Sequence, residues 1–560
     1  MNKKFLFVSA VLLVVVFALV YFGVNATSNW GKSKDQVTAE DAGKKLNKLY
    51  AKIAPLSADP IKGQIDLDPV NVADTLPDIS KFPITVENTT DNFVEIFSST
   101  EKSGSGVDGW LTETATAFNN ANIVVNGKPA SVKIRNIASG TATDYIKSKK
   151  YVPDAFTPSN ELWGEMVKAS GVKTELIAKR LVGNVPGIVI SKSKHDTLVQ
   201  KYGSVNVKTV TEAISNNEFS MGYTDPFASS TGLNFLVTAL YTFDPANPLG
   251  EQAVQGFEQF QANVPFIAST TIQMRDAATS GRLDGFVLEY QTFINAAELK
   301  NDYVFTPFGF RHDSPLYALG DLPKEKLDVI KKFAEFVQQE KYQTAAKDKG
   351  FNNLENYKQE LEPVDGSTLI SAQKIWKEKK NGDKSIAAVF VADVSGSMDG
   401  EPLMKLKESL IKGQKYLGKD NSIGLVSYSD QVTIHLPIGK FDANQQSMFV
   451  GAVESLEASG GTATFNGIVA AIKMLEDEMA KNPQVKPLIF VLSDGETNRG
   501  YTLQDIRGLI ENYRIPIYTI GYNANIEALK SISSINEAAS INADTDDVVY
   551  KIGSLFNVQM

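Results

Sequence analysis

Three oxygen-bearing side chains follow an apolar run in the last third of the chain. Residues 387–392 are all small or apolar, and Asp393, Ser395 and Ser397 come directly after them at alternate positions. Such a run suits a strand buried on both faces of a parallel sheet, and alternate residues of an extended segment point the same way. We therefore expect these three side chains to converge on one hard cation, such as Mg²⁺, Mn²⁺ or Ca²⁺.

Two later stretches supply further oxygen atoms for the same ion. Thr462 follows a pair of glycines between two helical patterns, and Asp494 comes at the end of a second buried strand that begins near residue 487. Mg²⁺, the ion we expect, prefers near-octahedral oxygen coordination and usually keeps waters, so a Glu or Asp of another protein can complete its shell. The predicted metal ligands are Asp393, Ser395, Ser397, Thr462 and Asp494.

Other interpretations of the first loop are weaker. An EF-hand loop needs Gly at its sixth position and a carboxylate at its twelfth, where this chain has Met398 and Met404. A hydrolase nucleophile elbow needs Gly-x-Ser-x-Gly, and neither serine has that frame. Capping of a helix near Glu401 would explain an isolated Asp-x-Ser-x-Ser motif, but it leaves the Thr462 and Asp494 loops unexplained.

Residues 385–560 resemble a von Willebrand factor type A domain, in which a metal-ion-dependent adhesion site is built from the same three parts in the same order. The resemblance implies a doubly wound, Rossmann-like α/β domain and adhesive use of the metal, coupled to a shift of the last helix. The sequence pattern itself predicts helices at 405–417, 465–479 and 547–555 and strands at 423–427, 432–436 and 515–520. That order is typical of a doubly wound sheet.

Hydroxyl side chains also follow strands in the middle of the chain. Strands are predicted at 93–97 and 131–137, and each leads into a short polar turn and then a helix; residues 221–232 repeat the pattern. Backbone N–H groups at helix N-termini, together with hydroxyls, favour anions or polar ligands, although helix capping alone would also explain the hydroxyls. The tentative ligand-binding residues are Ser98, Ser99, Ser139, Thr141, Ser159, Ser229 and Ser230.

Residues 91–362 resemble the bacterial extracytoplasmic solute-binding proteins. The turns just described carry this resemblance, together with residues 287–290 and a terminal helix that leads to residues 349–351. It implies a periplasmic-binding-protein-like α/β module whose two lobes close on a small polar or anionic solute. The chain has no cysteine, so it lacks the lipid-modified residue that anchors many of these proteins.

The N-terminus carries a membrane signal. Lys3 and Lys4 precede the uncharged apolar residues 5–24, which as a helix would span roughly 30 Å of hydrocarbon. The lysines favour the cytoplasmic side, so we expect a single-pass protein of the cell membrane with its domains outside. A signal peptide cleaved near residues 24–26 is the alternative, and it would give a secreted protein.

Composition excludes several functional classes. The chain has 560 residues and a net charge of -9, with 56 basic and 65 acidic residues, so a nucleic-acid partner is not expected. Disulfides and thiolate sites are excluded by the lack of cysteine. His195, His312 and His435 are expected on the surface or in loops rather than in a metal site. No nucleophile stands beside a base, so we do not expect an enzyme.

These observations predict an α/β protein with five segments. They are an anchor or signal at 1–26, a stalk or packed extension at 27–90 with a helix at 37–53, the two-lobed module at 91–362, a linker at 363–384 and the C-terminal domain at 385–560. We expect an anchored extracytoplasmic binding or adhesion protein whose metal engages an acidic residue of a protein partner. The alternative is a solute receptor of a transport or envelope system, in which the C-terminal domain recruits partner proteins.

Overall fold

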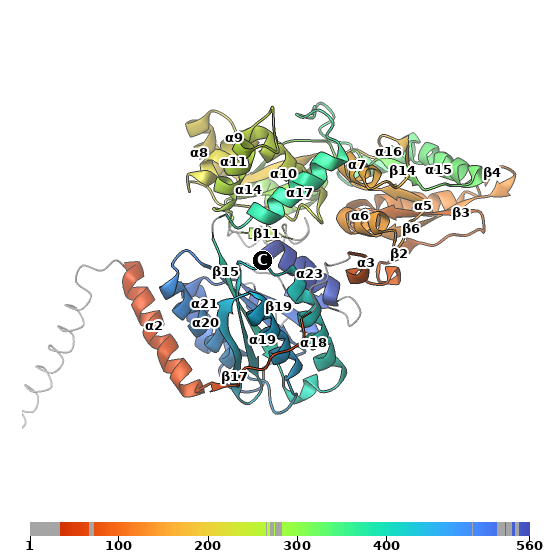
Figure 1. Ribbon diagram of the computed structural model, residues 1–560. Coiled ribbons are helices and arrows are strands. Elements are labelled where there is room, and N and C mark those ends of the chain that lie inside the picture. The colour runs from red at the N-terminus through yellow and green to blue at the C-terminus, as the bar shows by residue number, and fades with distance from the viewer. Residues whose placement is uncertain are drawn as a thin grey trace, which may run out of the picture.

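The structure, a computed structural model, has two main bodies joined through the end of the C-terminal domain (Figure 1). It describes residues 34–560 apart from 66–71, 265, 269–273, 275–282, 383, 496, 523–531, 534–539 and 544–547. The two-lobed module forms the upper body in Figure 1 and the C-terminal domain forms the lower one.

The C-terminal domain is built on a mixed seven-stranded sheet with the order β1-β17-β16-β15-β18-β19-β20. All neighbouring strands are parallel except β16 and β17, which form the predicted antiparallel hairpin. The strands are β1 (Leu56–Ser57), β15 (Ile386–Asp393), β16 (Ser422–Tyr428), β17 (Val432–Lys440), β18 (Lys486–Ser493), β19 (Ile517–Tyr522) and β20 (Ser540–Ala543).

Helices cover both faces of this sheet, because the central strands direct apolar side chains to both faces. In β15 the side chains of Ile386 and Phe390 enter one core while those of Val389 and Val391 enter the other. The helices on the first face are α18 (Glu401–Gly413), α19 (Ala443–Glu454) and α23 (Val548–Gln559). Those on the second face are α2 (Lys34–Ile53), α20 (Thr464–Lys481) and α21 (Leu503–Tyr513). The predicted doubly wound α/β architecture is therefore present.

The segment expected as a stalk or packed extension is divided between the two bodies. Helix α2 buries Ala42 and Leu46 against the core beneath α20 and α21, and β1 adds a parallel strand to the edge of the C-terminal sheet. Further along, β2 (Ile84–Val86) pairs with a strand of the two-lobed module. The described part of 27–90 is thus packed rather than a free stalk, because its apolar face and its strands find partners in both bodies.

The two-lobed module contains one sheet in each lobe. The first has the order β2-β6-β3-β7-β14-β8 and the second the order β11-β10-β12-β9-β13. Strands of the first lobe are β3 (Phe93–Ser98), β6 (Ser131–Asn136), β7 (Ala155–Thr157), β8 (Thr174–Ala178) and β14 (Leu316–Leu319). Strands of the second lobe are β9 (Pro186–Ser191), β10 (Met221–Thr224), β11 (Phe266–Ala268), β12 (Gly285–Glu289) and β13 (Tyr303–Pro307).

Helices connect these strands, and the chain crosses twice between the lobes, from β8 to β9 and back from β13 to β14. The two crossovers pair with each other through Asn184 and His312, whose backbone N–H groups each donate to the carbonyl of the other residue, at 2.9 and 3.0 Å. The longer helices are α5 (Trp110–Asn120), α6 (Ser139–Ser148), α7 (Glu161–Ala169), α8 (Lys192–Tyr202), α9 (Val207–Ser215), α10 (Ser230–Phe243), α11 (Glu251–Gln261), α15 (Lys324–Val337) and α16 (Glu340–Asp348). The short helices include α3 (Val72–Thr75), α4 (Thr100–Ser103), α13 (Tyr290–Asn295) and α14 (Ala297–Asp302).

The segment predicted as a linker, 363–384, instead contains a packed helix, α17 (Gly366–Lys379). Its Trp376 is fully buried in the core of the two-lobed module, and the indole Nε1–H donates to the hydroxyl of Tyr223 at 2.6 Å. The sequence did not indicate this packing. Few apolar residues form the buried side of the helix, and lysines surround its one large aromatic residue, Trp376.

The predicted N-terminal anchor at residues 1–26 lies outside the described residues. Among the residues that are described, none of the helices combines the length and the apolar character that a bilayer crossing requires.

Candidate functional site

Three loops at the carboxyl ends of β15 and β18 and before α20 are held together by backbone hydrogen bonds. Gly396 N–H donates to the carbonyl of Gly460 at 2.9 Å, which ties the first loop to the second. The carbonyl of Thr462 accepts from the N–H groups of Asn498 and Arg499 at 3.0 and 3.1 Å, which ties the second loop to the third. The five predicted metal ligands are therefore gathered at one edge of the sheet.

Asp393 forms the buried base of this loop cluster. Its carboxylate is fully buried and accepts hydrogen bonds from the Ser395 N–H at 2.9 Å, the Ser493 hydroxyl at 2.6 Å and the Tyr428 hydroxyl at 3.1 Å. Burial, and after it the charge of Asp393, holds the pKa of Tyr428 well above its usual value. These contacts fix the position of the carboxylate.

The other predicted ligands lie between this base and solvent. The hydroxyls of Ser395 and Ser397 are 3.1 Å apart, and that of Ser397 donates to Asp494 at 3.1 Å. Ser395 and Thr462 are buried, Asp494 is half-buried and Ser397 is exposed. The cluster is thus closed at Asp393 and open at Ser397 and Asp494.

The chemistry of these side chains fits a hard divalent cation. All five offer oxygen atoms, and burial together with the neighbouring Asp393 carboxylate raises the pKa of Asp494. The repulsion between the two carboxylates is what a bound cation would relieve. Among the described residues, no group of three acidic, histidine or cysteine side chains is placed to hold a metal ion, so hydroxyls must supply part of any such coordination.

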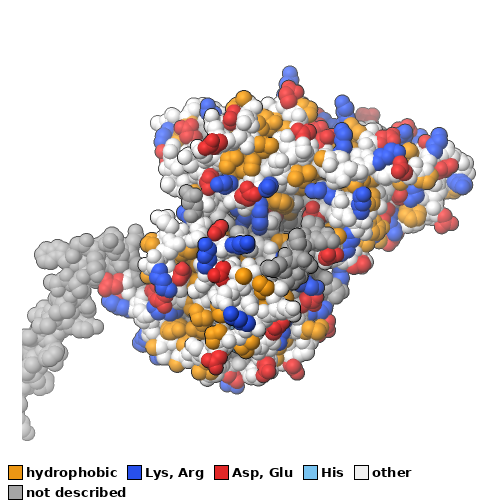
Figure 2. Space-filling model, in the orientation of Figure 1, with side chains coloured by type: hydrophobic (Ala, Val, Ile, Leu, Met, Phe, Trp, Pro, Cys, Tyr) orange, Lys and Arg blue, Asp and Glu red, His pale blue; other side chains and the backbone are white. Residues whose placement is uncertain are grey.

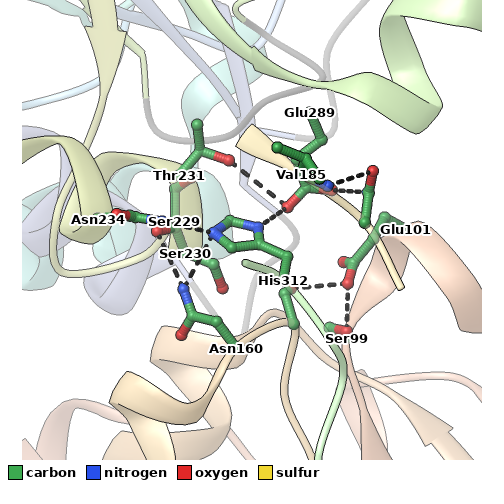
Figure 3. A network of polar contacts seen from close by, with 12 residues as sticks. Ser99, Glu101, Asn160, Val185, Ser229, Ser230, Thr231, Asn234, Glu289 and His312 are labelled. Carbon is green, nitrogen blue, oxygen red and sulfur yellow. Dashed lines mark hydrogen bonds and ion pairs between the residues drawn. The ribbon is translucent and has the colours of Figure 1, made fainter. Parts of the chain in front are cut away.

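A second polar cluster lies between the lobes of the module (Figure 3). Its small cavity, about 30 Å³, is lined by residues of both lobes, among them Glu101 and Glu289. Lys102 is fully buried beside Glu101, with its ammonium 3.7 Å from the carboxylate and bonded to the carbonyl of Thr157 at 2.9 Å. Burial would raise the pKa of Glu101, but Lys102 and two serine hydroxyls lower it overall, so Glu101 is ionised.

Glu289 and His312 meet on the other side of this cavity. The amide of Asn234 donates to the carbonyl of Phe310 and accepts from its N–H, which identifies the amide nitrogen. This nitrogen lies 3.2 Å from His312 Nε2, and the amide nitrogen of Asn160 lies 3.1 Å from the same atom. Because two donors face Nε2, this nitrogen accepts, and Nδ1–H donates to Glu289 at 2.7 Å. His312 is thus a neutral imidazole. It lies in the crossover between the lobes, which agrees with the expected surface or loop position only as far as the loop, and it is buried because that crossover runs through the interior.

The structure brings some of the predicted ligand-binding residues to this cavity and leaves others outside it. Ser139, Ser159, Ser229 and Ser230 line it, and the Ser159 hydroxyl donates to Glu101 at 2.7 Å. Ser99 contacts Glu101 and Lys102. Two predicted residues lie elsewhere: Ser98 is buried with its hydroxyl directed at the carbonyl of Ser99, and Thr141 bonds the Tyr550 hydroxyl of α23 at 2.7 Å.

The titratable residues at this cavity were not predicted as ligands; they are Glu101, Lys102, Glu289 and His312. Glu101 and Lys102 directly follow the Ser98–Thr100 turn, and Glu289 is the last residue of the buried strand β12. A carboxylate at the end of a buried strand was the signal that identified Asp494, and it applies equally to Glu289. Nothing in the sequence around His312 indicates its position, because the partners that bury it come from three distant segments.

Comparison with known protein families confirms both resemblances. Residues 388–554 match the von Willebrand factor type A domain, and residues 103–352 match the family described as bacterial extracellular solute-binding protein. The chain therefore carries a von Willebrand factor type A domain joined to a solute-binding-protein-like region.

Similar individual proteins cover only parts of the chain. An uncharacterized protein of Synechocystis is 28% identical over 26% of this chain and 34% of its own length. Inter-alpha-trypsin inhibitor heavy chain H1 of Mesocricetus auratus is 27% identical over 25% of this chain and 16% of its own length. The alignments thus span about a third or less of these relatives.

Solved structures match each body separately. A von Willebrand factor type A protein from Catenulispora acidiphila is 19% identical, with a TM-score of 0.29, over 31% of this chain and 42% of that one. A periplasmic thiamin binding protein is 10% identical, with a TM-score of 0.39, over 53% of this chain and 99% of that one.

Proposed function

We propose that this chain is an extracytoplasmic binding or adhesion protein that uses a divalent cation, Mg²⁺ for preference, to engage an acidic residue of a protein partner. The observation that supports the proposal is the gathering of Asp393, Ser395, Ser397, Thr462 and Asp494 in one loop cluster that is closed at Asp393 and open at Ser397. When bound, the cation supplies a Lewis-acidic position to which a partner's carboxylate can bind.

Each residue of the cluster has a distinct part in this function. Asp393 holds the only fully buried carboxylate of the five predicted ligands and anchors the charge. The hydroxyls of Ser395, Ser397 and Thr462 are neutral, so they leave most of the positive charge of a divalent ion uncompensated. Asp494 stands at the half-open rim, where it can bind the ion directly or through water. A partner carboxylate would approach from the Ser397 side.

The test compares partner capture with and without the metal. Candidate surface proteins and acidic peptides are presented to the full chain in Mg²⁺ and in EDTA, and Asp393→Asn is compared with Asp420→Asn. Asp420 is an exposed residue before β16 that only pairs with Lys440 at 3.7 Å. Capture should require Mg²⁺ and Asp393 and should be unaffected by Asp420→Asn. Capture that persists in EDTA would overturn the metal-dependent function.

A second function, binding of a small polar solute between the lobes, is supported by the paired carboxylates Glu101 and Glu289 from opposite lobes. Burial, and beyond it the charge of Glu101, raises the pKa of Glu289 although the His312 hydrogen bond opposes this. Two carboxylates facing one cavity disfavour an anionic solute, so a polar or cationic solute fits better than the anion that the hydroxyls alone suggested.

Titration calorimetry of the full chain against sugars, amino acids, amines and inorganic anions tests this second function. Saturable binding of a neutral or cationic compound that is lost in Glu101→Gln is the expected result. A compound that binds equally well to Glu101→Gln would not occupy the cleft, and selective binding of anions would contradict the assignment.

We further propose that residues 5–24 anchor the chain in the cell membrane with both bodies outside. The basis is the pair of lysines that precedes a twenty-residue apolar run. Membrane fractionation together with protease digestion of intact cells tests this topology. A chain recovered from the medium without its first residues would indicate cleavage instead.

A further inference from the structure

A cavity of about 370 Å³ lies at the junction of the two bodies, away from both sites described above. Its walls come from three segments that are distant in sequence: residues 261–264 at the end of α11, residues 380, 381 and 384 after α17, and residues 483–487 at the start of β18. Figure 2 shows Lys and Arg side chains on both sides of the hollow between the upper and lower bodies. We refer to this cavity as the junction cavity.

The lining of the junction cavity is positively charged. It includes Lys380 and Lys384 from the module side and Lys486 from the C-terminal domain, and none of the lining residues that the structure describes is acidic. Four amide side chains add further polar groups, those of Gln261, Asn263, Asn381 and Gln484.

The three lysines have little to balance their charge. The Lys380 ammonium lies 2.9 Å from the carbonyl of Val558 and 5.5 Å from the Trp376 ring, and that of Lys384 lies 3.3 Å from the carbonyl of Ala262. These partners are neutral. Within the described part of the chain, none of the three makes an ion pair with a carboxylate.

The pKa values of two of these lysines, Lys380 and Lys486, are lowered. Burial first, and then the charges of Lys377 and Lys486, hold the pKa of Lys380 well below its usual value, although the charge of the buried Asp225 opposes this. Burial and the charge of Lys384 lower the pKa of Lys486 to about 8. Bringing ammonium groups together in a partly dry cavity without an anion is unfavourable, so an anion bound there would stabilise the arrangement.

We propose that the junction cavity binds a multivalent oxyanion of the phosphate or sulfate class, held between Lys380 and Lys384 of one body and Lys486 of the other. Because its ligands come from both bodies, the anion fixes their relative position. The volume admits either a free inorganic anion or the phosphate group of a small organic molecule, and the two sources can be separated by experiment.

The experiment measures binding of inorganic phosphate, sulfate and a nucleoside monophosphate to the full chain by titration calorimetry at pH 7, with sodium chloride at equal ionic strength as the reference. Saturable binding beyond the chloride reference is expected. Equal affinity for phosphate and the monophosphate would indicate that the phosphate group alone is recognised, and tighter binding of the monophosphate would indicate an organic ligand. Heats that do not exceed those of chloride overturn the proposal.

Two variants assign the binding to this cavity. Lys486→Gln removes one charge from the lining and should weaken binding by about tenfold or more, since an ion-assisted contact is lost. The control is Lys481→Gln, because Lys481 is exposed at the end of α20 and pairs with Glu478 at 3.4 Å. This variant should bind the anion as the wild type does. Lys384→Gln repeats the test from the module side. If Lys486→Gln and Lys384→Gln both fold and bind normally, the anion does not occupy the junction cavity.

The pH dependence provides a separate check. An anion favours the protonated lysine, so binding should weaken as the pH rises through about 8, where Lys486 loses its charge beside Lys380 and Lys384. Binding at pH 8 should take up protons, seen as a difference in heat between buffers of unequal ionisation enthalpy. Affinity that is constant from pH 7 to 9 would contradict the involvement of these lysines.

Discussion

The loop cluster of the C-terminal domain and the interlobe cavity of the module each contain two carboxylates, but the carboxylates are balanced differently. Asp393 and Asp494 have hydroxyl and backbone partners and no basic side chain within hydrogen-bonding distance among the described residues. Glu101 lies against the buried ammonium of Lys102, and Glu289 accepts from a neutral imidazole.

This difference indicates what each site can bind. Two carboxylates without a nearby basic side chain would suit a divalent ion, because the ion would cancel the repulsion between them. In the interlobe cavity one carboxylate is paired with a lysine and the other accepts a hydrogen bond from histidine. This cavity therefore suits a polar or singly cationic ligand that is bound mainly through hydrogen bonds. The following predictions test this contrast, from the largest expected effect to the smallest.

The largest effect is expected from Glu289→Ala. It leaves His312 Nδ1–H and the Asn184 amide, now 2.7 and 3.1 Å from the carboxylate, without an acceptor in the interior, which should cost roughly 2–5 kcal/mol of unfolding free energy. Three of the four tryptophans, Trp110, Trp163 and Trp376, lie in the module, and the C-terminal domain has none. Denaturation of a Trp30→Phe background followed by tryptophan fluorescence therefore reports on the module alone. The matched control is Glu113→Ala, whose exposed carboxylate pairs with Lys349 and should change stability by less than about 1 kcal/mol. Equal effects of the two variants would mean that the hydrogen bonds of Glu289 with His312 and Asn184 contribute nothing to stability.

The metal response should be confined to the C-terminal domain. At one hundred times its dissociation constant, Mg²⁺ should stabilise the native state by about 2.7 kcal/mol, measured by calorimetry of the full chain. Ser397→Ala, a change at the exposed rim, should reduce this gain, while Ser230→Ala in the interlobe cavity should retain it. A loss of the response in both variants would show that the two sites are not independent.

A smaller effect is expected where the two bodies meet. Thr141→Val removes the hydrogen bond to the Tyr550 hydroxyl and should cost about 1 kcal/mol. Thr116→Val serves as the control, because Thr116 is exposed and its hydroxyl bonds only to the carbonyl of Thr112 in the same helix. Solute binding should be unaffected by Thr141→Val, since this residue does not line the interlobe cavity. Weaker solute binding would instead return Thr141 to the set of ligand residues.

The smallest effect concerns pH. The pKa of Asp494 is raised in the folded chain by burial and by Asp393, so without metal the native state binds more protons than the unfolded state in the window between the two pKa values. Stability should therefore fall as the pH rises from 3.8 through the folded pKa, and Asp494→Asn should remove that part of the decline. Saturating Mg²⁺ should also remove it. Thermal unfolding across pH 4 to 7 in EDTA measures the effect, and an identical profile for Asp494→Asn would contradict the proposed repulsion.

Much of the fold could be predicted from the sequence, because its signals are local. The apolar run before Asp393 predicted the central strand, and the helix at 37–53 is present as α2. The failures are equally specific. Residues 363–384 were expected as a linker, and nothing in the sequence indicated that His312, expected on the surface or in a loop, would be buried. In both cases the decisive contacts, Trp376 with Tyr223 and His312 with Glu289, join segments more than twenty residues apart.

The sequence by itself determined which oxygen atoms belong to the loop cluster, since in a parallel sheet every strand delivers its carboxyl-end residues to the same edge. The tertiary structure alone decided how the charges are balanced. It placed Lys102 beside Glu101 in the interior and a neutral His312 beside Glu289, and it left Lys380, Lys384 and Lys486 facing one another across the junction cavity. The positions of strands along the chain follow from local apolar patterns, whereas charge balance depends on distances between side chains that only the packed chain defines.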